Sequence, residues 1–363
     1  MKEIQIKFSL IQVFRGIAAL LVLIHHGAYT GEEYLNYEYL NGIFKVGWIG
    51  VDFFFILSGF IIYYVHSKDI GIKTKMKTFI LKRFIRVYPI YGIMTTFLLF
   101  LFFIVPNWGV GYETSIDVII KSFLLFPQEH APIISVGWTL EHEIFFYIMF
   151  SLLIFLKPKY SVVIASMWII GIVSNSVGII NLEKKIFLNF VFSNYNLEFI
   201  FGCIVGYIFL NYKVKYNKSL ILMGIIGFIS GWYFVYQDDL IRYTTLAILV
   251  FGISFSLIVL ATVNVEKSNK IKVPKFLLVL GDASYSIYLT HFYILLLLFK
   301  VLSKLESINP FNDFITITCT FIIAIILGVM FHIVIEKPLI NFLNKNILKQ
   351  RPPLKSGSAT KVA

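Results

Sequence analysis

The sequence predicts an all-α polytopic membrane protein, and composition, span length and charge placement each point to this class. Of the 363 residues, 58% are hydrophobic, 17% aromatic and only 14% charged, and the mean hydropathy is +0.82, far from the average soluble domain. About ten apolar stretches approach the roughly 20 residues that cross a hydrocarbon core. Their expected limits are 9–28, 47–66, 88–105, 139–157, 161–180, 196–212, 219–236, 242–262, 284–303 and 313–335.

The lysines and arginines predict the orientation of these spans. An even number of spans leaves both termini on one side, and the positive-inside rule assigns that side to the cytoplasm. With cytoplasmic termini, most of the 32 basic residues fall in cytoplasmic segments, so the net charge of +12 reflects topology. Nucleic-acid binding is disfavoured because the charges are spread over several short segments. We expect a single transmembrane domain over 1–345 and a disordered cytoplasmic tail over 346–363.

The first span, FRGIAALLVLIHH, contains Arg15 and His26. At about 100° per residue, eleven steps bring His26 to within about 20° of Arg15, roughly 16 Å further along the helix. Charged groups are costly inside a membrane, so we expect the pair to mark two points on one internal path. His25 lies about 100° away from this face, and a haem ligated by the two adjacent histidines is disfavoured because they point apart. The sequence suggests no metal site.

Carboxylates in the second and fourth spans are the candidate partners of His26. Asp52 lies about one and a half turns inside the second span, where an aspartate must face a cavity or pair with a base; a structural hydrogen bond to a neighbouring helix is an equal alternative. In the fourth span, Glu143 is favoured over Glu141, which we expect to be solvated at the edge of the span. Opposite running directions bring His26, Asp52 and Glu143 to similar depths. This predicts His26 as a general base oriented by Glu143 or Asp52.

The most basic run, KTKMKTFILKRFIRVYPIY, precedes the third span and contains Arg83 and Arg86. Arginines at i and i+3 share a helix face and can grip a phosphate. The spacing alone favours the other interpretation, in which both side chains snorkel to the membrane surface as positive-inside anchors.

The ninth span, DASYSIYLTHFYILL, starts from the cytoplasmic side with Tyr285 low in the membrane. His291 should lie roughly 10 Å into the membrane. It could line the same internal path, or it could be an interhelical hydrogen-bonding residue, and the two alternatives are about equally favoured.

Taken in chain order, six segments resemble the integral-membrane acyltransferase family 3, best represented by bacterial enzymes that O-acylate surface sugars. They are RGIAALLVLIHH, GVDFFFILSGF, KRFIRVYPIY, WTLEHEIFFY, SYSIYLTH and the EKP of Glu336, Lys337 and Pro338. The resemblance spans nearly the whole chain, and WTLxxExFFY is similar to the branch that acetylates exopolysaccharides.

This resemblance implies an enzyme that moves an acyl group, expected to be acetyl, from cytoplasmic acyl-CoA to a sugar hydroxyl at the outer side of a bacterial inner membrane. The acceptor would be a polysaccharide or a lipid-linked glycan, and no tightly bound cofactor is expected. The implied roles are a catalytic histidine at His26 with Arg15 as its companion, the family glutamate at Glu143, and Arg83 with Arg86 toward the nucleotide end of the donor. From their place on the ninth span, Tyr285 and His291 are assigned to the same donor path. A polytopic transporter and a non-catalytic component of a glycan-export complex remain as alternatives.

Overall fold

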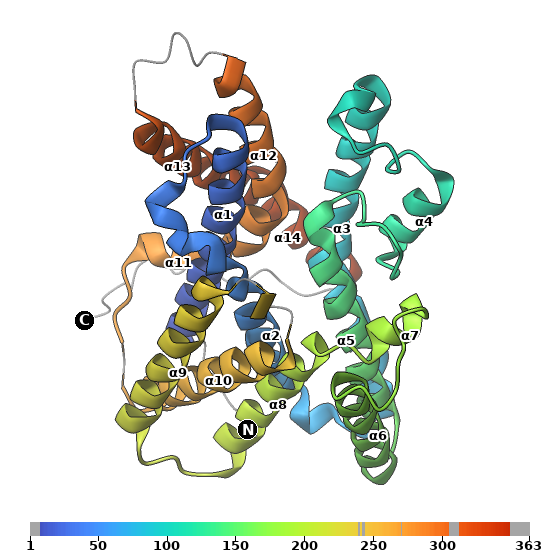
Figure 1. Ribbon diagram of the computed structural model, residues 1–363. Coiled ribbons are helices and arrows are strands. Elements are labelled where there is room, and N and C mark those ends of the chain that lie inside the picture. Colours follow the sequence, from blue (N-terminus) through green and yellow to red (C-terminus); the bar gives the residue numbers. More distant parts are fainter. Residues whose placement is uncertain (1–7, 239, 242–243, 270, 305–311, 349–363) are drawn as a thin grey trace, which may run out of the picture.

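The computed structural model describes residues 8–238, 240–241, 244–269, 271–304 and 312–348, and every regular element in this part of the chain is helical (Figure 1). The helices are α1 (Ser9–Leu35), α2 (Gly50–His66), α3 (Met76–Ile104), α4 (Ile116–Leu124), α5 (Trp138–Phe155), α6 (Pro158–Ser176), α7 (Ile186–Val191), α8 (Tyr195–Asn211), α9 (Asn217–Gln237), α10 (Thr245–Ser268), α11 (Lys275–Asp282), α12 (Ser284–Lys304), α13 (Asp313–Phe331) and α14 (Lys337–Ile347).

Nine helical segments of the described chain are long and apolar enough to cross a membrane, which confirms the all-α polytopic class. They correspond to nine of the ten predicted spans. The remaining predicted span, 161–180, is present as α6, a helix of 19 residues, but it is not among the nine. Serine and asparagine residues along α6 lower its hydropathy, so the predicted even number of spans, and with it the orientation, stays a prediction.

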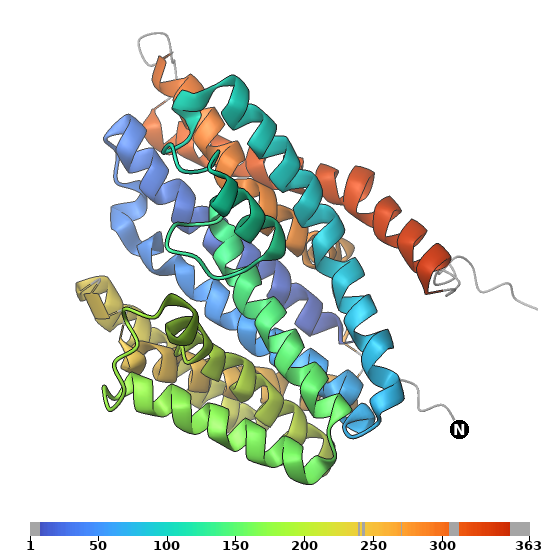
Figure 2. The same cartoon turned by 90° about the vertical axis from the view of Figure 1, so that its right-hand side faces the viewer.

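Two groups of helices flank the centre of the molecule. In Figure 1, α1 with α12 and α13 lies on one side, α3 with α5 lies on the other, and α2 passes between them. Figure 2 shows α8, α9 and α10 as a layer beneath α1 and α2. The polar residues predicted from the sequence therefore come from helices that face a common centre.

Small residues let α2 and α8 approach closely. A Cβ atom built on Gly202 would lie 2.1 Å from the carbonyl oxygen of Ile56, and one built on Gly59 would lie 2.1 Å from the carbonyl oxygen of Phe199. Such contacts are possible only for glycine, and close backbone packing of this kind is how membrane helices associate. The contact fixes α2, which carries Asp52 and Ser58.

The last span is not a plain α-helix. A π-helical turn over His332–Glu336 joins α13 to α14, within a continuous helical segment of 35 residues. A π-turn adds a residue to the helical turn and is frequent at functional sites. Here it contains the fully buried Glu336. The predicted tail lies, from residue 349 onward, outside the described residues.

Candidate active site

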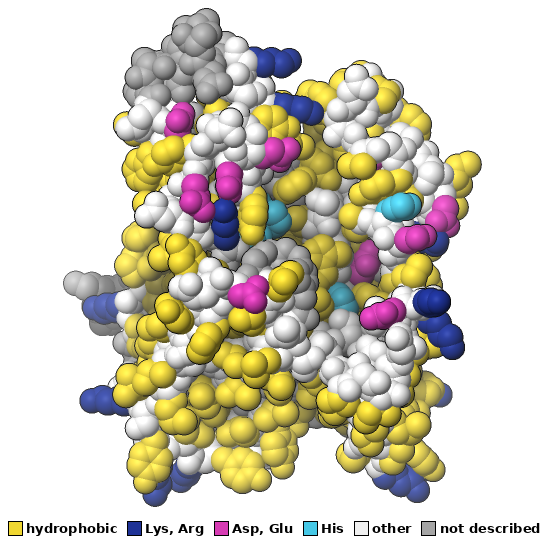
Figure 3. Space-filling view, in the orientation of Figure 1, with side chains coloured by type: hydrophobic (Ala, Val, Ile, Leu, Met, Phe, Trp, Pro, Cys, Tyr) yellow, Lys and Arg dark blue, Asp and Glu magenta, His cyan; other side chains and the backbone are white. Residues whose placement is uncertain are grey.

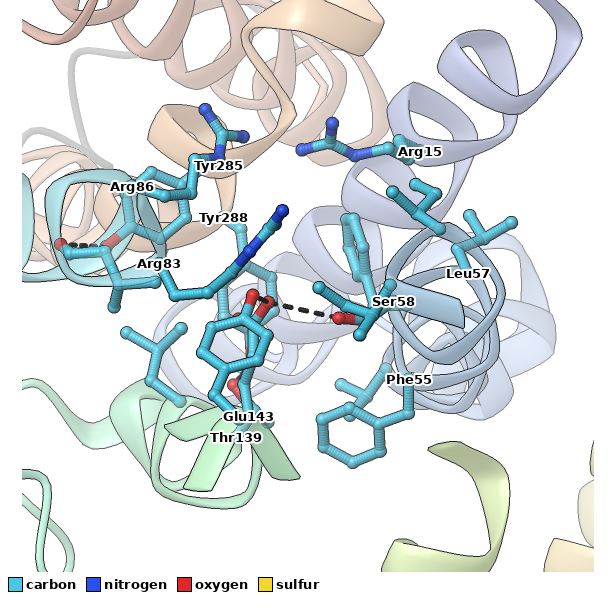
Figure 4. Close-up of a pocket in the computed structure, with 17 residues that line it drawn as sticks. Arg15, Phe55, Leu57, Ser58, Arg83, Arg86, Thr139, Glu143, Tyr285 and Tyr288 are labelled. Carbon is cyan, nitrogen blue, oxygen red and sulfur yellow. Dashed lines mark hydrogen bonds between the residues drawn. The ribbon is translucent and has the colours of Figure 1, made fainter. Parts of the chain in front are cut away.

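Three arginines from two distant segments converge on one cavity of about 140 Å³, which we call the arginine pocket (Figure 4). Arg15 comes from α1, and Arg83 and Arg86 come from α3. The other polar side chains of the lining are Ser58, Thr139, Glu143, Tyr147, Tyr285 and Tyr288. Because three guanidinium groups face a single carboxylate, the lining carries net positive charge and suits an anion.

Arg83 and Arg86 line this internal pocket, which favours binding over the snorkelling alternative. Nη2 of Arg83 lies 3.4 Å from Nε2 of His66, whose Nδ1 is 2.8 Å from Oδ2 of Asp69. The buried Nε of Arg83 has no acceptor among the described residues. One edge of this guanidinium is therefore held by the protein, and the Nε donor is left for a ligand.

Arg86 is held by the buried carboxylate of the π-helical turn. Its Nη1 donates to Oε1 of Glu336 over 3.0 Å. The other oxygen of Glu336 accepts from Ser286 Oγ at 2.6 Å and lies 2.7 Å from Nδ1 of His332. The segment that carries EKP thus orients Arg86 toward the pocket, a role that short-range sequence patterns do not reveal because the two residues are 250 positions apart.

Glu143 lies in the arginine pocket and not beside His26, which corrects the predicted pairing. Ser58 Oγ donates to its Oε1 at 3.3 Å, and the hydroxyl of Tyr147 donates to the same oxygen. Sequence reasoning set Glu143 and His26 at one depth, but the residue of α5 that reaches the surroundings of His26 is Trp138. Glu143 lies five residues further along, about 7.5 Å deeper. Ser58 is thus a polar residue of this pocket.

His26 faces a separate cavity of about 300 Å³, which we call the histidine pocket. Its lining consists of Val22, His25, His26, Trp48, Val51, Asp52, Trp138, Tyr195 and Tyr288. Val51 and Tyr288 also line the arginine pocket, so the two cavities adjoin. The expectation that Arg15 and His26 use one face of an unbroken helix is met, since both residues lie on α1 and face this pair of cavities.

A second histidine is the hydrogen-bonding partner of His26. Nε2 of His291 lies 3.0 Å from Nδ1 of His26. His291 was predicted on the donor path, yet it does not line the arginine pocket. Its other nitrogen lies 2.6 Å from the carbonyl oxygen of Tyr288. Between its two sequence-based interpretations, the structure favours the interhelical hydrogen bond.

Carbonyl acceptors determine which nitrogen of each ring carries the proton. A carbonyl oxygen can only accept, so Nδ1 of His291 donates to Tyr288 and its Nε2 presents a lone pair when the ring is neutral. The Nδ1 of His26 lies 3.1 Å from the carbonyl oxygen of Val22 and 3.0 Å from that lone pair. It therefore carries the hydrogen, and Nε2 of His26 holds the free lone pair.

Asp52 lines the histidine pocket and is fully buried, but the predicted hydrogen bond to His26 is not formed. Neither of its carboxylate oxygens has a hydrogen-bond partner on another described residue. Glu198 of α8 is likewise fully buried without such a partner. The sequence reasoning missed Glu198, although a carboxylate inside a predicted span could have identified it.

Tyr285 lies where it was predicted, low on α12 in the arginine pocket. Its hydroxyl donates to the carbonyl oxygen of Val87 over 2.9 Å, and the guanidinium carbon of Arg86 lies 5.5 Å from the centre of its ring. The ring therefore helps to fix the side chain of Arg86.

These features define a multi-pass membrane protein with an internal, arginine-lined pocket beside a hydrogen-bonded histidine pair. Residues 9–333 match the family described as an acyltransferase domain, and the chain belongs to this integral-membrane acyltransferase family. It is 24% identical to the exopolysaccharide production protein ExoZ of Rhizobium meliloti over 310 residues. The aligned region covers 82% of this chain and 90% of ExoZ.

A second relative is the O-acetyltransferase OatA of Staphylococcus aureus, 25% identical over 326 residues, with 77% of this chain and 49% of OatA covered. The chain thus spans about half the length of this relative. No solved structure matches the chain.

Proposed function

We propose that this acyltransferase moves an acetyl group from cytoplasmic acetyl-CoA to a hydroxyl group of a surface or exopolysaccharide sugar, or of its lipid-linked precursor, at the outer side of a bacterial inner membrane. The names of the two relatives support exopolysaccharide and O-acetyl transfer as the class of reaction. The observation that carries the proposal is the adjacency of two chemically different cavities, which meet at Val51 and Tyr288.

The arginine pocket supports a phosphorylated donor. Two of its three guanidinium groups, those of Arg83 and Arg86, belong to the basic run at 73–86, which is predicted to face the cytoplasm, where the anion would arrive. A cavity of about 140 Å³ is smaller than the roughly 300 Å³ of ordinary ligand pockets. Only part of a coenzyme A molecule fits inside, so its nucleotide would remain outside the pocket while the thioester arm extends past Arg15 toward Tyr288.

His26 is the proposed general base. Its Nε2 lone pair accepts the proton of a sugar hydroxyl while the hydroxyl oxygen attacks the thioester carbonyl carbon. The carbon–sulfur bond then breaks, the leaving thiolate takes the proton back from His26, and the products are the acetyl ester and free coenzyme A. During the step the positive charge of His26 is stabilised by the lone pair of His291, which accepts from Nδ1 at 3.0 Å.

Tyr288 stands at the junction of the two pockets. Its hydroxyl lies 2.9 Å from Thr139 Oγ1 and donates to the carbonyl oxygen of Val136 at 3.2 Å. These bonds hold the ring where donor and acceptor would meet. We assign Tyr288 a positioning role, in which contact with its side chain limits how far the thioester enters.

The test is release of free thiol from acetyl-CoA by the purified full chain in detergent, with water as acceptor. Wild-type protein and a His130→Ala control should consume acetyl-CoA, and His26→Ala should not. His130 is an exposed loop histidine outside both pockets, which makes it a matched control for loss of an imidazole. Absence of hydrolysis by the wild-type protein, or full activity of a well-folded His26→Ala variant, contradicts the proposal.

A further inference from the structure

A third cavity, larger than the other two, lies beside the histidine pocket. Its volume is about 1200 Å³, and we call it the outer groove. It is formed by the segment before α5, the start of α5, the residues between α6 and α8, and the start of α10. Figure 3 shows a hollow on this face of the molecule where acidic and histidine side chains gather. Apart from residues on the helices, the lining comes from the loops predicted to be extracytoplasmic.

The lining of the outer groove has the chemistry of a carbohydrate site. Amide and hydroxyl side chains such as Asn189 and Ser193 can donate and accept hydrogen bonds with sugar hydroxyls. Phe190 and Tyr195 add aromatic surface to the lining, against which the C–H side of a sugar ring can pack. Few apolar side chains accompany them, so the groove does not resemble a site for a lipid chain.

The charge of the groove limits which carbohydrate it can take. Two exposed carboxylates, Glu129 and Glu183, and the buried side chain of Glu141 line it together with one basic side chain, Lys184. Carboxylates accept hydrogen bonds from neutral hydroxyl groups and attract protonated amines, but they repel uronic acids and phosphates. The balance therefore favours neutral or amino sugars.

Glu141 carries an unused acceptor at this wall. The side chain is 7% exposed, in contrast to the solvated position expected from the sequence, and its Oε1 has no hydrogen-bond partner among the described residues. The neighbouring His142 does not donate to this oxygen, because its Nδ1 donates to Oδ1 of Asn196 over 3.1 Å. A buried carboxylate oxygen without a donor is unfavourable, and a ligand hydroxyl in the groove would supply the missing donor.

One residue connects the outer groove to the catalytic histidine. Tyr195 lines both the groove and the histidine pocket, and its ring centre lies 5.2 Å from that of Trp138, another wall of the histidine pocket. Tyr195 is therefore a wall shared by the groove and the cavity that contains His26, so a saccharide in the groove lies next to the histidine pocket.

We infer that the outer groove is the acceptor site of the enzyme and that it binds a stretch of neutral or amino sugars, with Glu141 accepting a hydrogen bond from the chain. The inference rests on the proposed function for its place in the reaction. Binding itself needs no donor, so the site can be tested whether or not acetyl transfer is established.

The experiment is calorimetric titration of the purified full chain, without acetyl-CoA, using three tetrasaccharides as probes: glucose units (maltotetraose), glucosamine units and galacturonate units. We expect binding of the glucose and glucosamine probes and at least about tenfold weaker binding of the galacturonate probe. Glu141→Gln should weaken the two favoured probes by about tenfold. Equal affinity for all three probes, or no binding of any, overturns the inference.

Because a substitution of the buried Glu141 could disturb folding, a second variant reverses the charge at exposed positions of the groove. Glu129→Lys with Glu183→Lys changes side chains that lie on the surface, and it should invert the preference, so that galacturonate binds best. Glu33→Lys, an exposed glutamate on α1 outside the groove, should leave the preference unchanged. An unaltered preference in the double variant also overturns the inference.

Thiol release from acetyl-CoA separates this inference from the proposed function. The glucose tetramer should stimulate thiol release by the wild-type protein, and the double variant should lose this stimulation. Glu33→Lys, outside the groove, should keep both the basal hydrolysis rate and the stimulation. If no variant and no wild-type protein hydrolyses acetyl-CoA but the probes bind as expected, the proposed reaction fails and the saccharide site stands. If hydrolysis proceeds and groove variants respond to the probes like the wild-type protein, the site fails and the reaction stands.

Discussion

Nε2 of His291 lies 3.0 Å from Nδ1 of His26, although the two residues are 265 positions apart in the chain. The bond joins α1 to α12 and fixes the tautomer of His26. Because Nδ1 of His291 donates its hydrogen to the carbonyl oxygen of Tyr288, Nε2 of His291 can only accept, and Nδ1 of His26 is the donor. A neutral histidine thus does for His26 what a carboxylate does in a serine protease triad, which is to orient the imidazole and to accept from its Nδ1–H.

Replacement of His291 tests this positioning role. His291→Leu should lower kcat by about 10- to 100-fold with little change in KM for acetyl-CoA, since the donor pocket is untouched. His291→Gln keeps an acceptor that can face Nδ1 of His26, so it should retain more of kcat than His291→Leu. The measurement is steady-state acetyl transfer with both variants. Equal loss in the two variants would point to packing, and a change confined to KM would contradict the assignment.

The second prediction concerns the guanidinium of Arg83. Arg83→Ala should raise KM for acetyl-CoA by about 10- to 100-fold, and Arg83→Lys should recover only part of the affinity, because a lysine cannot reproduce the planar fork. Lys77→Ala removes an exposed positive charge of the same basic run outside the pocket. It should change KM little, so comparable effects of the two alanine variants would favour a general surface attraction over a specific site.

The third prediction concerns the buried partner of Arg86. Glu336→Ala leaves the arginine and Ser286 without their shared acceptor and should destabilise the protein by about 3 kcal/mol, since it breaks a buried pair from one side. Asp117→Asn breaks an exposed pair, that of Asp117 with Lys121, and should cost less than about 0.5 kcal/mol. Thermal unfolding in detergent measures both. A similar melting temperature for the two variants would show that Glu336 does not anchor α3.

The fourth prediction compares two glycines that differ only in the space around them. Gly202→Ala drives a methyl group against the carbonyl of Ile56 and should cost about 1–3 kcal/mol as α8 moves away from α2. At Gly92 a Cβ would meet no atom within 4 Å, so Gly92→Ala should be neutral or should stabilise α3 by up to about 1 kcal/mol. The same thermal unfolding assay decides, and a stable Gly202→Ala variant would argue against tight packing of α2 on α8.

Much of the fold could be predicted because apolar length is a local property. Nine of the expected spans are present, and the helix phase of Arg15 and His26 followed from a single periodicity. The exception is α6, which was predicted as a membrane span. Its polar residues bring its hydropathy below that of the other spans.

The candidate site was harder to predict because it depends on relative depths and on contacts between distant helices. The predicted start of α5 was right to within one residue. The depth at which α5 packs relative to α1 is not encoded in either helix alone, and this relative depth separates Glu143 from His26. The partnership of His26 with His291 and that of Arg86 with Glu336 join residues 265 and 250 positions apart. No spacing rule along one chain covers such distances, so only the packed bundle reveals them.

The most direct measurement of the central claim uses proteoliposomes that hold the full chain in one orientation. Acetyl-CoA labelled in the acetyl group is supplied only on the side of Arg83 and Arg86, and an oligosaccharide is supplied only on the side of the outer groove. The account predicts labelled acetyl ester on the saccharide in this arrangement, and none when the two substrates are exchanged between the sides. Transfer only when both substrates share one side would contradict the passage of the acetyl group between the two adjoining pockets.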